Sequence, residues 1–150
     1  MKRSLLSLIL TGVLLIGFYG YSAAGEYRKI SEAQLKEALK HEIKANKLDD
    51  AGRLDEAIKE YEEALELNPY SVSCLFNLGL AYLKAGRNAE AIYTYERAID
   101  LAPEDAELYK LLGIAFIKNG EREKAINAWE KSLALNPEQP RVKEFIEINR

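Results

Sequence analysis

The sequence contains almost no cysteine or histidine. Among its 150 residues there is one cysteine, Cys74, and one histidine, His41. A single cysteine cannot form a disulfide within the chain, and we expect Cys74 to be buried in an apolar helix. No cysteines or carboxylates stand at zinc-ligand spacing around His41. We therefore expect no metal, no cofactor, no catalytic residue and no enzyme activity, with His41 as a surface or inter-helix side chain rather than a lone base.

Basic runs and glycine-rich loops are also missing. The formal net charge is −3, from 21 basic and 24 acidic side chains, and no basic stripe of the kind that binds nucleic acid is present. The 9 glycines are scattered along the chain, so none of them builds a phosphate-binding loop. Hydrophobic residues make up 48% of the chain and there are only 4 prolines, which is typical of a folded protein and not of a disordered one.

One long uncharged run lies at the N-terminus, over residues 4–25, directly after Lys2 and Arg3. A basic flank, an apolar core and small residues up to Ala24 are typical of a signal peptide that is cleaved after Ala24. The same run is long enough to serve as an uncleaved membrane anchor. In both cases the basic flank stays inside and the rest is exported. We expect a periplasmic or secreted protein after cleavage, or otherwise a single-pass protein that meets the membrane only through residues 4–25.

Four sets of residues recur at a spacing of 34. They are Gly52, Gly86 and Gly120; Ala57, Ala91 and Ala125; Tyr61, Tyr95 and Trp129; and Pro69, Pro103 and Pro137. A fixed period of this length indicates stacked repeats. The glycines fall where a helix would end and reverse, and the prolines fall between repeats, because proline does not continue a preceding helix.

The period divides the chain into segments. We assign residues 1–24 to the signal peptide or anchor, 25–37 to a linker with the start of the first helix, and 38–71, 72–105 and 106–139 to three helix-turn-helix units. Residues 140–150 are predicted to form a capping helix. Its Val142, Phe145 and Ile148 would cover the third unit, since the open end of a solenoid needs a cover.

The second and third units match the pattern of a known family. The second carries, in order, Leu75, Leu78, Gly79, Tyr82, Ala91, Tyr95 and Pro103, and the third carries Tyr109, Leu112, Gly113, Phe116, Ala125, Trp129 and Pro137. Both resemble tetratricopeptide repeats, while the first unit keeps only the second half of the pattern. The resemblance implies an all-α superhelical solenoid of helix-turn-helix repeats with a C-terminal capping helix.

In each unit, one side of the first helix is expected to face the second helix of the same unit. A second row of residues runs along another side of the first helix, and we call this row the stripe. Along the three units this stripe consists of Glu42, Asn46 and Asp49, then Phe76, Leu80 and Leu83, then Lys110, Ile114 and Ile117. The resemblance implies that such positions line a concave groove, here acidic at one end and apolar in its middle and far end. Two interpretations stay open: neighbouring repeats or residues 26–37 bury the stripe, or the stripe receives an apolar segment of a partner.

One use of this fold is excluded by the residues at the matching positions. Some tetratricopeptide domains hold the C-terminal carboxylate of a chaperone with Lys, Asn, Asn, Lys and Arg. The matching residues here are Glu42, Asn46, Asn77, Glu107 and Leu111. All three cations are missing and two are replaced by acids, so a carboxylate would be repelled.

The resemblance leaves two functions open. The first is a non-catalytic adapter or assembly factor, working in an exported or membrane-tethered setting of a bacterial-type envelope, that binds a protein or peptide partner in the groove. The second is a structural scaffold that forms a homo-oligomer, either through the same stripe or by end-to-end stacking of the arrays. We expect no nucleic-acid partner.

Overall fold

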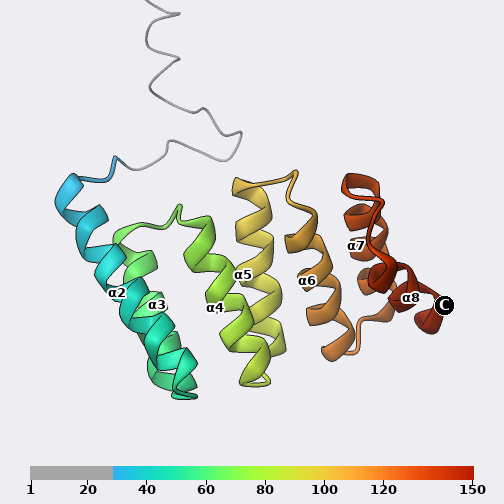
Figure 1. The fold of residues 1–150 in the computed structure, drawn as a ribbon, viewed down its shortest axis with the longest axis horizontal. Helices are drawn as coiled ribbons and strands as arrows, with labels where there is room; N and C mark the ends of the chain where they lie inside the picture. The colour runs from blue at the N-terminus through green and yellow to red at the C-terminus, as the bar shows by residue number, and fades with distance from the viewer. Residues whose placement is uncertain (1–28) are drawn as a thin grey trace, which may run out of the picture. The chain divides into compact units, whose positions relative to one another are not determined.

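The computed structural model describes residues 29–150, and the predicted signal peptide or anchor lies outside this part. Within it the chain forms α-helices and no strands, which confirms the all-α prediction. The helices are α2 (Glu32–Asp50), α3 (Leu54–Leu67), α4 (Val72–Lys84), α5 (Asn88–Leu101), α6 (Ala106–Lys118), α7 (Arg122–Leu135) and α8 (Pro140–Asn149) (Figure 1). None of these helices is both long enough and apolar enough to cross a bilayer.

The helices pack as antiparallel pairs that stack in chain order. The pairs are α2 with α3, α4 with α5 and α6 with α7, and they meet one another through α3 and α4 and through α5 and α6. Figure 1 shows the pairs side by side along the long axis, with α8 at the C-terminal end. Because each pair contacts only its neighbours, the fold is the predicted helical repeat solenoid.

A glycine reverses the chain inside each pair. Gly52, Gly86 and Gly120 have φ angles of 73°, 74° and 84°. Glycine adopts this left-handed conformation without strain, whereas in other residues the Cβ atom makes it unfavourable. At the second of these turns the amide of Arg87 donates to the carbonyl of Tyr82 at 2.8 Å. This bond closes the end of α4 in the manner of a Schellman motif, so that α5 starts at Asn88 and runs back along α4.

Close contact inside each pair depends on small residues. A Cβ atom placed on Gly79 would come within 2.5 Å of Cε1 of Tyr95, so the aromatic ring occupies the space of a side chain at this position. Trp129 meets Gly113 in the same way. Tyr95 and Ala91 are fully buried. The aromatic column of the repeat therefore fills the core between the helices of each pair.

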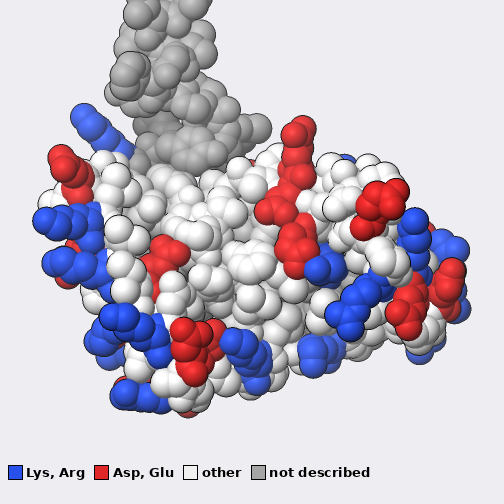
Figure 2. Space-filling model, in the orientation of Figure 1, with Lys and Arg blue, Asp and Glu red and all other residues white. Residues whose placement is uncertain are grey.

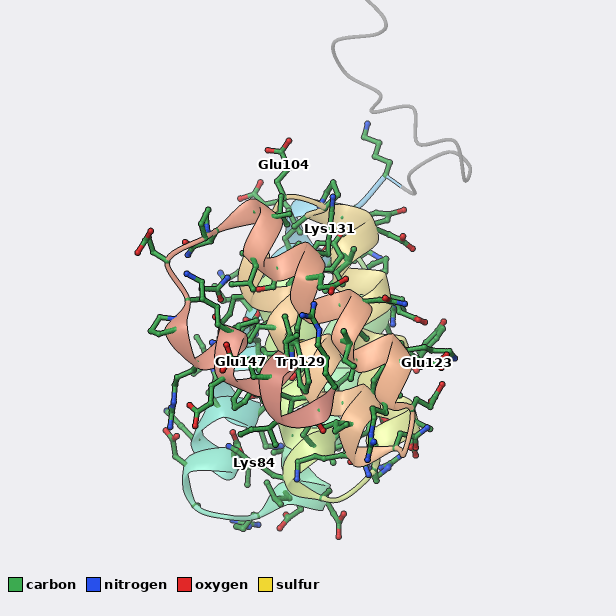
Figure 3. The ribbon with its side chains drawn as sticks, turned by 90° about the vertical axis from the view of Figure 1, so that its right-hand side faces the viewer. Lys84, Glu104, Glu123, Trp129, Lys131 and Glu147 are labelled. Carbon is green, nitrogen blue, oxygen red and sulfur yellow. The ribbon has the colours of Figure 1, made fainter. Side chains whose placement is uncertain are left out.

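The C-terminal end of the array is covered by α8, through two of the three predicted residues and Ile146. Val142 and Ile146 are buried, and the ring of Phe145 lies 5.4 Å from that of Trp129. Ile148 is 73% exposed, so its predicted role in the cap is wrong. At about 100° per residue, Ile146 lies close to Val142 around the helix, whereas Ile148 lies about a third of a turn away. Figure 3 views the array from this end, with Trp129 near its centre.

Candidate binding site

The predicted groove residues lie on the first helices of the three pairs, α2, α4 and α6. The apolar members are all partly buried and pack against the core: Phe76, Leu80, Leu83, Ile114 and Ile117. Each keeps part of its surface exposed, so the other helices of the described part do not seal the stripe. Figure 2 shows this face, and its middle, over α4, is uncharged. An apolar strip therefore reaches the surface there.

A hydrogen-bond network orders the side chains at the α2 end of the face. The amide oxygen of Asn46 accepts a hydrogen bond from the hydroxyl of Tyr61 at 2.6 Å and another from the amide nitrogen of Asn77 at 3.2 Å. Tyr61 is almost fully buried. The network therefore joins a core aromatic of α3 to polar side chains of α2 and α4, which holds Asn46 and Asn77 in one orientation.

The two acidic residues at this end have different surroundings. Asp49 forms a salt bridge with Lys84 across α2 and α4, with 2.6 Å between carboxylate oxygen and Nζ. Glu42 accepts a hydrogen bond from the hydroxyl of Ser73 at 2.8 Å and has no basic partner among residues 29–150. The negative charge at this end therefore rests on Glu42, because Lys84 balances Asp49. Lys84, at the end of α4, is not among the predicted groove residues.

The α6 end contains a further ion pair. Nζ of Lys110 lies 2.6 Å from a carboxylate oxygen of Glu107, one helical turn earlier. The indole nitrogen of Trp129 donates to the backbone carbonyl of Lys110 at 3.1 Å. The core aromatic of this pair thus finds its partner in the backbone of α6.

The aromatic residue of the middle pair finds no partner. The hydroxyl of Tyr95 is buried and makes no hydrogen bond in the described part of the chain. The residue that takes the place of Asn46 here, one period later, is Leu80, which offers no acceptor. Burial, with a smaller effect of Glu107, raises the pKa of Tyr95 well above its usual value. A buried hydroxyl that has no partner among residues 29–150 therefore lies in the core of the middle pair.

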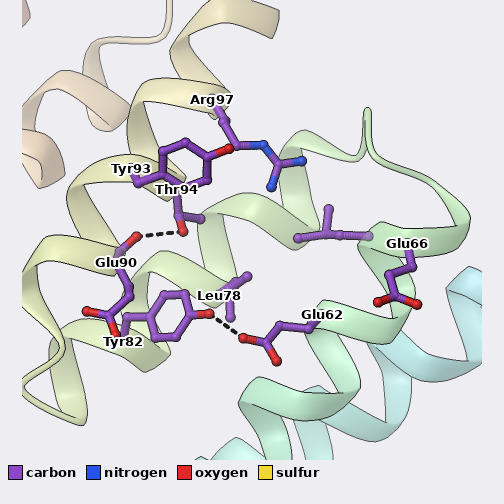
Figure 4. A pocket seen from close by; sticks show the side chains of 9 residues that line it. Glu62, Glu66, Leu78, Tyr82, Glu90, Tyr93, Thr94 and Arg97 are labelled. Atoms are coloured by element: carbon purple, nitrogen blue, oxygen red, sulfur yellow. Dashed lines mark hydrogen bonds between the residues drawn. The ribbon is translucent and has the colours of Figure 1, made fainter. Parts of the chain in front are cut away.

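A cavity on the second helices was not predicted. It has a volume of about 380 Å³ and lies between α3 and α5 (Figure 4). Its floor includes Leu65 and Leu78, and its sides carry Glu62 and Glu66 of α3 and Tyr93 of α5. Nothing in the local sequence pattern of α3 shows that α5 closes a hollow beside its acidic residues.

A second unpredicted feature is an apolar stripe on α2 that faces away from the core. Leu35, Leu39 and Ile43 are 45%, 55% and 46% exposed. Their spacing of four residues places them on one side of the helix. This spacing was readable in the sequence, but the pattern could not show that no other helix of residues 29–150 packs there.

The single histidine and the single cysteine have structural roles. Nδ1 of His41 lies 2.8 Å from a carboxylate oxygen of Glu60, which also accepts from Lys44 at 2.7 Å. These hydrogen bonds, that of Lys44 first, hold the pKa of Glu60 below its ordinary value. Cys74 is buried, and burial raises the pKa of its thiol to about 12. No cluster of potential metal ligands occurs among the described residues.

Two family models match the chain. Both describe the tetratricopeptide repeat, and they cover residues 44–106 and 82–147. No curated protein sequence matches the chain.

Several solved structures share the fold. The first tetratricopeptide domain of Spaghetti (RPAP3), bound to the HSP90 peptide SRMEEVD, has a TM-score of 0.72 and 25% identity over 77% of this chain and 91% of that one. MamA from Desulfovibrio magneticus has a TM-score of 0.71 and 25% identity, over 75% of this chain and 63% of that one. The N-terminal domain of stress-induced protein-1 from C. elegans has a TM-score of 0.71, with 21% identity over 79% and 98% of the two chains. The last similarity bears on the fold alone.

Proposed function

Residues 44–147 of this chain consist of tetratricopeptide repeats, and from this premise we propose that it is a non-catalytic adapter that binds a segment of a partner protein. Domains of this family are protein-interaction modules, and the RPAP3 domain binds a peptide. The fold and family are generally non-catalytic.

The observation that carries the proposal is the apolar strip on α4 and α6. Phe76, Leu80, Leu83, Ile114 and Ile117 pack against the core on one side and stay partly exposed on the other. A contiguous apolar surface on a folded protein normally marks a site of interaction. The strip runs across two helices of neighbouring pairs, which suits an apolar partner segment that lies along the array.

The polar residues at the two ends would orient such a segment. Glu42 carries the negative charge at the α2 end, whereas Lys110 is balanced by Glu107 at the other end. A basic residue next to the apolar segment would therefore meet Glu42. Charge complementarity of this kind acts mainly on orientation and on the rate of association. Asn46, which Tyr61 and Asn77 hold in place, offers a further polar group at the α2 end, one helical turn after Glu42.

Substitution of the strip tests the proposal. Leu80→Glu or Ile114→Glu places a carboxylate in the apolar strip, and we expect either change to abolish crosslinked capture of the partner from the host cell envelope. Ile148→Glu is the matched control, because Ile148 is exposed on α8 outside the strip. Circular dichroism checks that helicity is kept. Capture that survives both strip variants would show that the partner binds elsewhere.

We also propose that the module works outside the inner membrane, released or tethered. The support is the basic pair Lys2 and Arg3 followed by the uncharged residues 4–25. The N-terminal residue of the protein isolated from its host separates the two forms. A start at Gly25 shows cleavage and release, and an intact Met1 shows an anchor. Protein found with the cytoplasmic fraction would contradict the exported setting.

Self-association is the second candidate function, and the stripe of Leu35, Leu39 and Ile43 on α2 favours it. The C-terminal end of the array is covered by α8, while this stripe of α2 has no covering helix among residues 32–150. Apolar surface at the end of a solenoid needs a cover for solubility. A second copy of the chain can supply one.

A further inference from the structure

The α2 stripe and the α3–α5 cavity contain none of the predicted groove residues, although the stripe lies on α2 beside Glu42 and Asn46. We propose that they are the two sides of one contact, in which the α2 stripe of one copy docks into the α3–α5 cavity of another. The proposal rests on the second candidate function, self-association, and makes no use of the apolar strip on α4 and α6.

The α2 side of the contact combines apolar and basic residues. Leu35, Leu39 and Ile43 form the exposed stripe, and at about 100° per residue Lys36 and Lys40 lie together on one flank of it. Both lysines are exposed, and within the described part of the chain Lys40 pairs with Glu37 on its own helix. Such a helix face fits a hollow that has an apolar floor and acidic walls.

The cavity between α3 and α5 has an apolar floor and an acidic wall on the α3 side, while its α5 wall also carries Arg97. Leu65 and Leu78 contribute apolar floor, and Glu62 and Glu66 stand on the α3 wall (Figure 4). Lys59 is the only basic residue of α3. On the α5 wall, Tyr93 is 63% exposed, more than any other large apolar or aromatic side chain of the described part except Ile148. An exposed tyrosine ring beside carboxylates can bury the leucines of α2 against its face and can make cation–π contacts with the lysines of α2.

Contacts within the chain show that these walls bind cations. The guanidinium of Arg87 lies 4.5 Å from the ring centre of Tyr82, which lines the cavity, and donates to Glu90 at 2.9 Å. The guanidinium of Arg97 lies 5.8 Å from the ring centre of Tyr93. Tyrosine rings and a carboxylate thus already contact the guanidinium groups of the chain's own arginines at this cavity. A lysine of a second copy would meet the same chemistry on the α3 wall, where Glu62 accepts a hydrogen bond from Tyr82.

The geometry of the contact determines the kind of assembly. The α2 stripe and the cavity are different surfaces of one chain, so the contact is heterologous. Two copies joined in this way still have one free stripe and one free cavity. Heterologous contacts continue into rings or open chains of molecules, and we therefore expect species larger than a dimer as the concentration rises.

Charge reversal on each side tests the contact. The full chain is followed by light scattering over a range of concentrations. Lys36→Glu with Lys40→Glu on α2, or Glu62→Lys with Glu66→Lys in the cavity, is expected to weaken assembly about tenfold, because attraction becomes repulsion at both positions. The variant that carries all four changes is expected to assemble again, since the charges are then complementary with opposite sign. Lys143→Glu on α8 is the matched control and should assemble like the unchanged chain.

Two further measurements separate this contact from the groove. Leu39→Glu should block assembly, whereas Leu80→Glu should leave it unchanged, and salt at about 1 M should weaken it because the Debye length falls to about 3 Å. Circular dichroism confirms that each variant is folded. A chain that stays monomeric at all concentrations overturns the proposal, as does assembly that the charge reversals leave intact or that the fourfold variant fails to restore. None of these outcomes changes the expected effect of Leu80→Glu on partner capture.

Discussion

At the scale of single residues, equivalent positions of the three repeats differ in how they satisfy a buried polar group. Tyr61 donates to Asn46, and Trp129 donates to the backbone of Lys110. Tyr95 is equally buried and has no acceptor in the described part of the chain. A buried polar group without a partner costs about 1–3 kcal/mol. The middle repeat therefore tolerates a defect at the point where the apolar strip crosses the array.

Removal of the tyrosine hydroxyls makes this difference measurable. We expect Tyr95→Phe to leave the free energy of unfolding unchanged or to raise it by about 1 kcal/mol, because it removes an unsatisfied group. Tyr61→Phe, the matched variant, should lower the free energy of unfolding by about 1 kcal/mol, because Asn46 loses a hydrogen bond of 2.6 Å. Urea titration of both variants measures the effect. Equal losses in the two variants would mean that Tyr95 is hydrogen-bonded in solution.

At the scale of elements, the array depends on how its last pair of helices is covered. α8 buries Val142 and Ile146 against the third pair and places Phe145 beside Trp129. Without α8 this apolar surface would face water. The helices of one pair cannot bury both of their faces by themselves, so a terminal element is part of the fold and not an appendage.

Deletion of residues 140–150 tests the role of the cap. We expect the free energy of unfolding to fall by about 3 kcal/mol, since burial of Val142 and Ile146 contributes about 1.5–3 kcal/mol each and ordering the helix offsets part of this. Ile148→Ser should change it by less than about 0.5 kcal/mol, because Ile148 is exposed. Thermal and urea unfolding measure both. A deletion without loss of stability would show that α8 does not pack on Trp129 in solution.

At the scale of the whole molecule, the surfaces differ in chemical character. The face of the first helices is uncharged in its middle (Figure 2). The cavity lies between an acidic α3 and α5, which carries Arg97, and α2 presents an apolar stripe with lysines beside it. A single folded chain thus offers more than one surface to other molecules, and each can be tested by substitutions that leave the others intact.

From the charge of the first-helix face we expect that an acidic ligand does not bind there. The RPAP3 domain binds the HSP90 peptide SRMEEVD, which carries three acidic side chains and a C-terminal carboxylate. Here Glu42 and Glu107 stand where the resembled clamp has lysines, so we expect no binding below about 1 mM. Calorimetry or fluorescence anisotropy with this peptide measures it, with the RPAP3 domain as the positive control. Micromolar binding of the peptide would show that Glu42 and Glu107 do not prevent an acidic ligand from binding at this face.

The repeat architecture of this protein is determined by its sequence alone. Helices, turn glycines and the packing of Tyr95 on Gly79 recur with the 34-residue period, because each depends on contacts within one repeat or with the next. The differences between repeats depend on which side chains from distant positions meet, and only the tertiary structure decided these. Lys84 balances Asp49, Leu80 leaves Tyr95 without an acceptor, and α5 closes a cavity beside Glu62. The 34-residue period predicts the contacts that all repeats have in common. The candidate binding surfaces consist of residues that differ from one repeat to the next, so the period does not predict them.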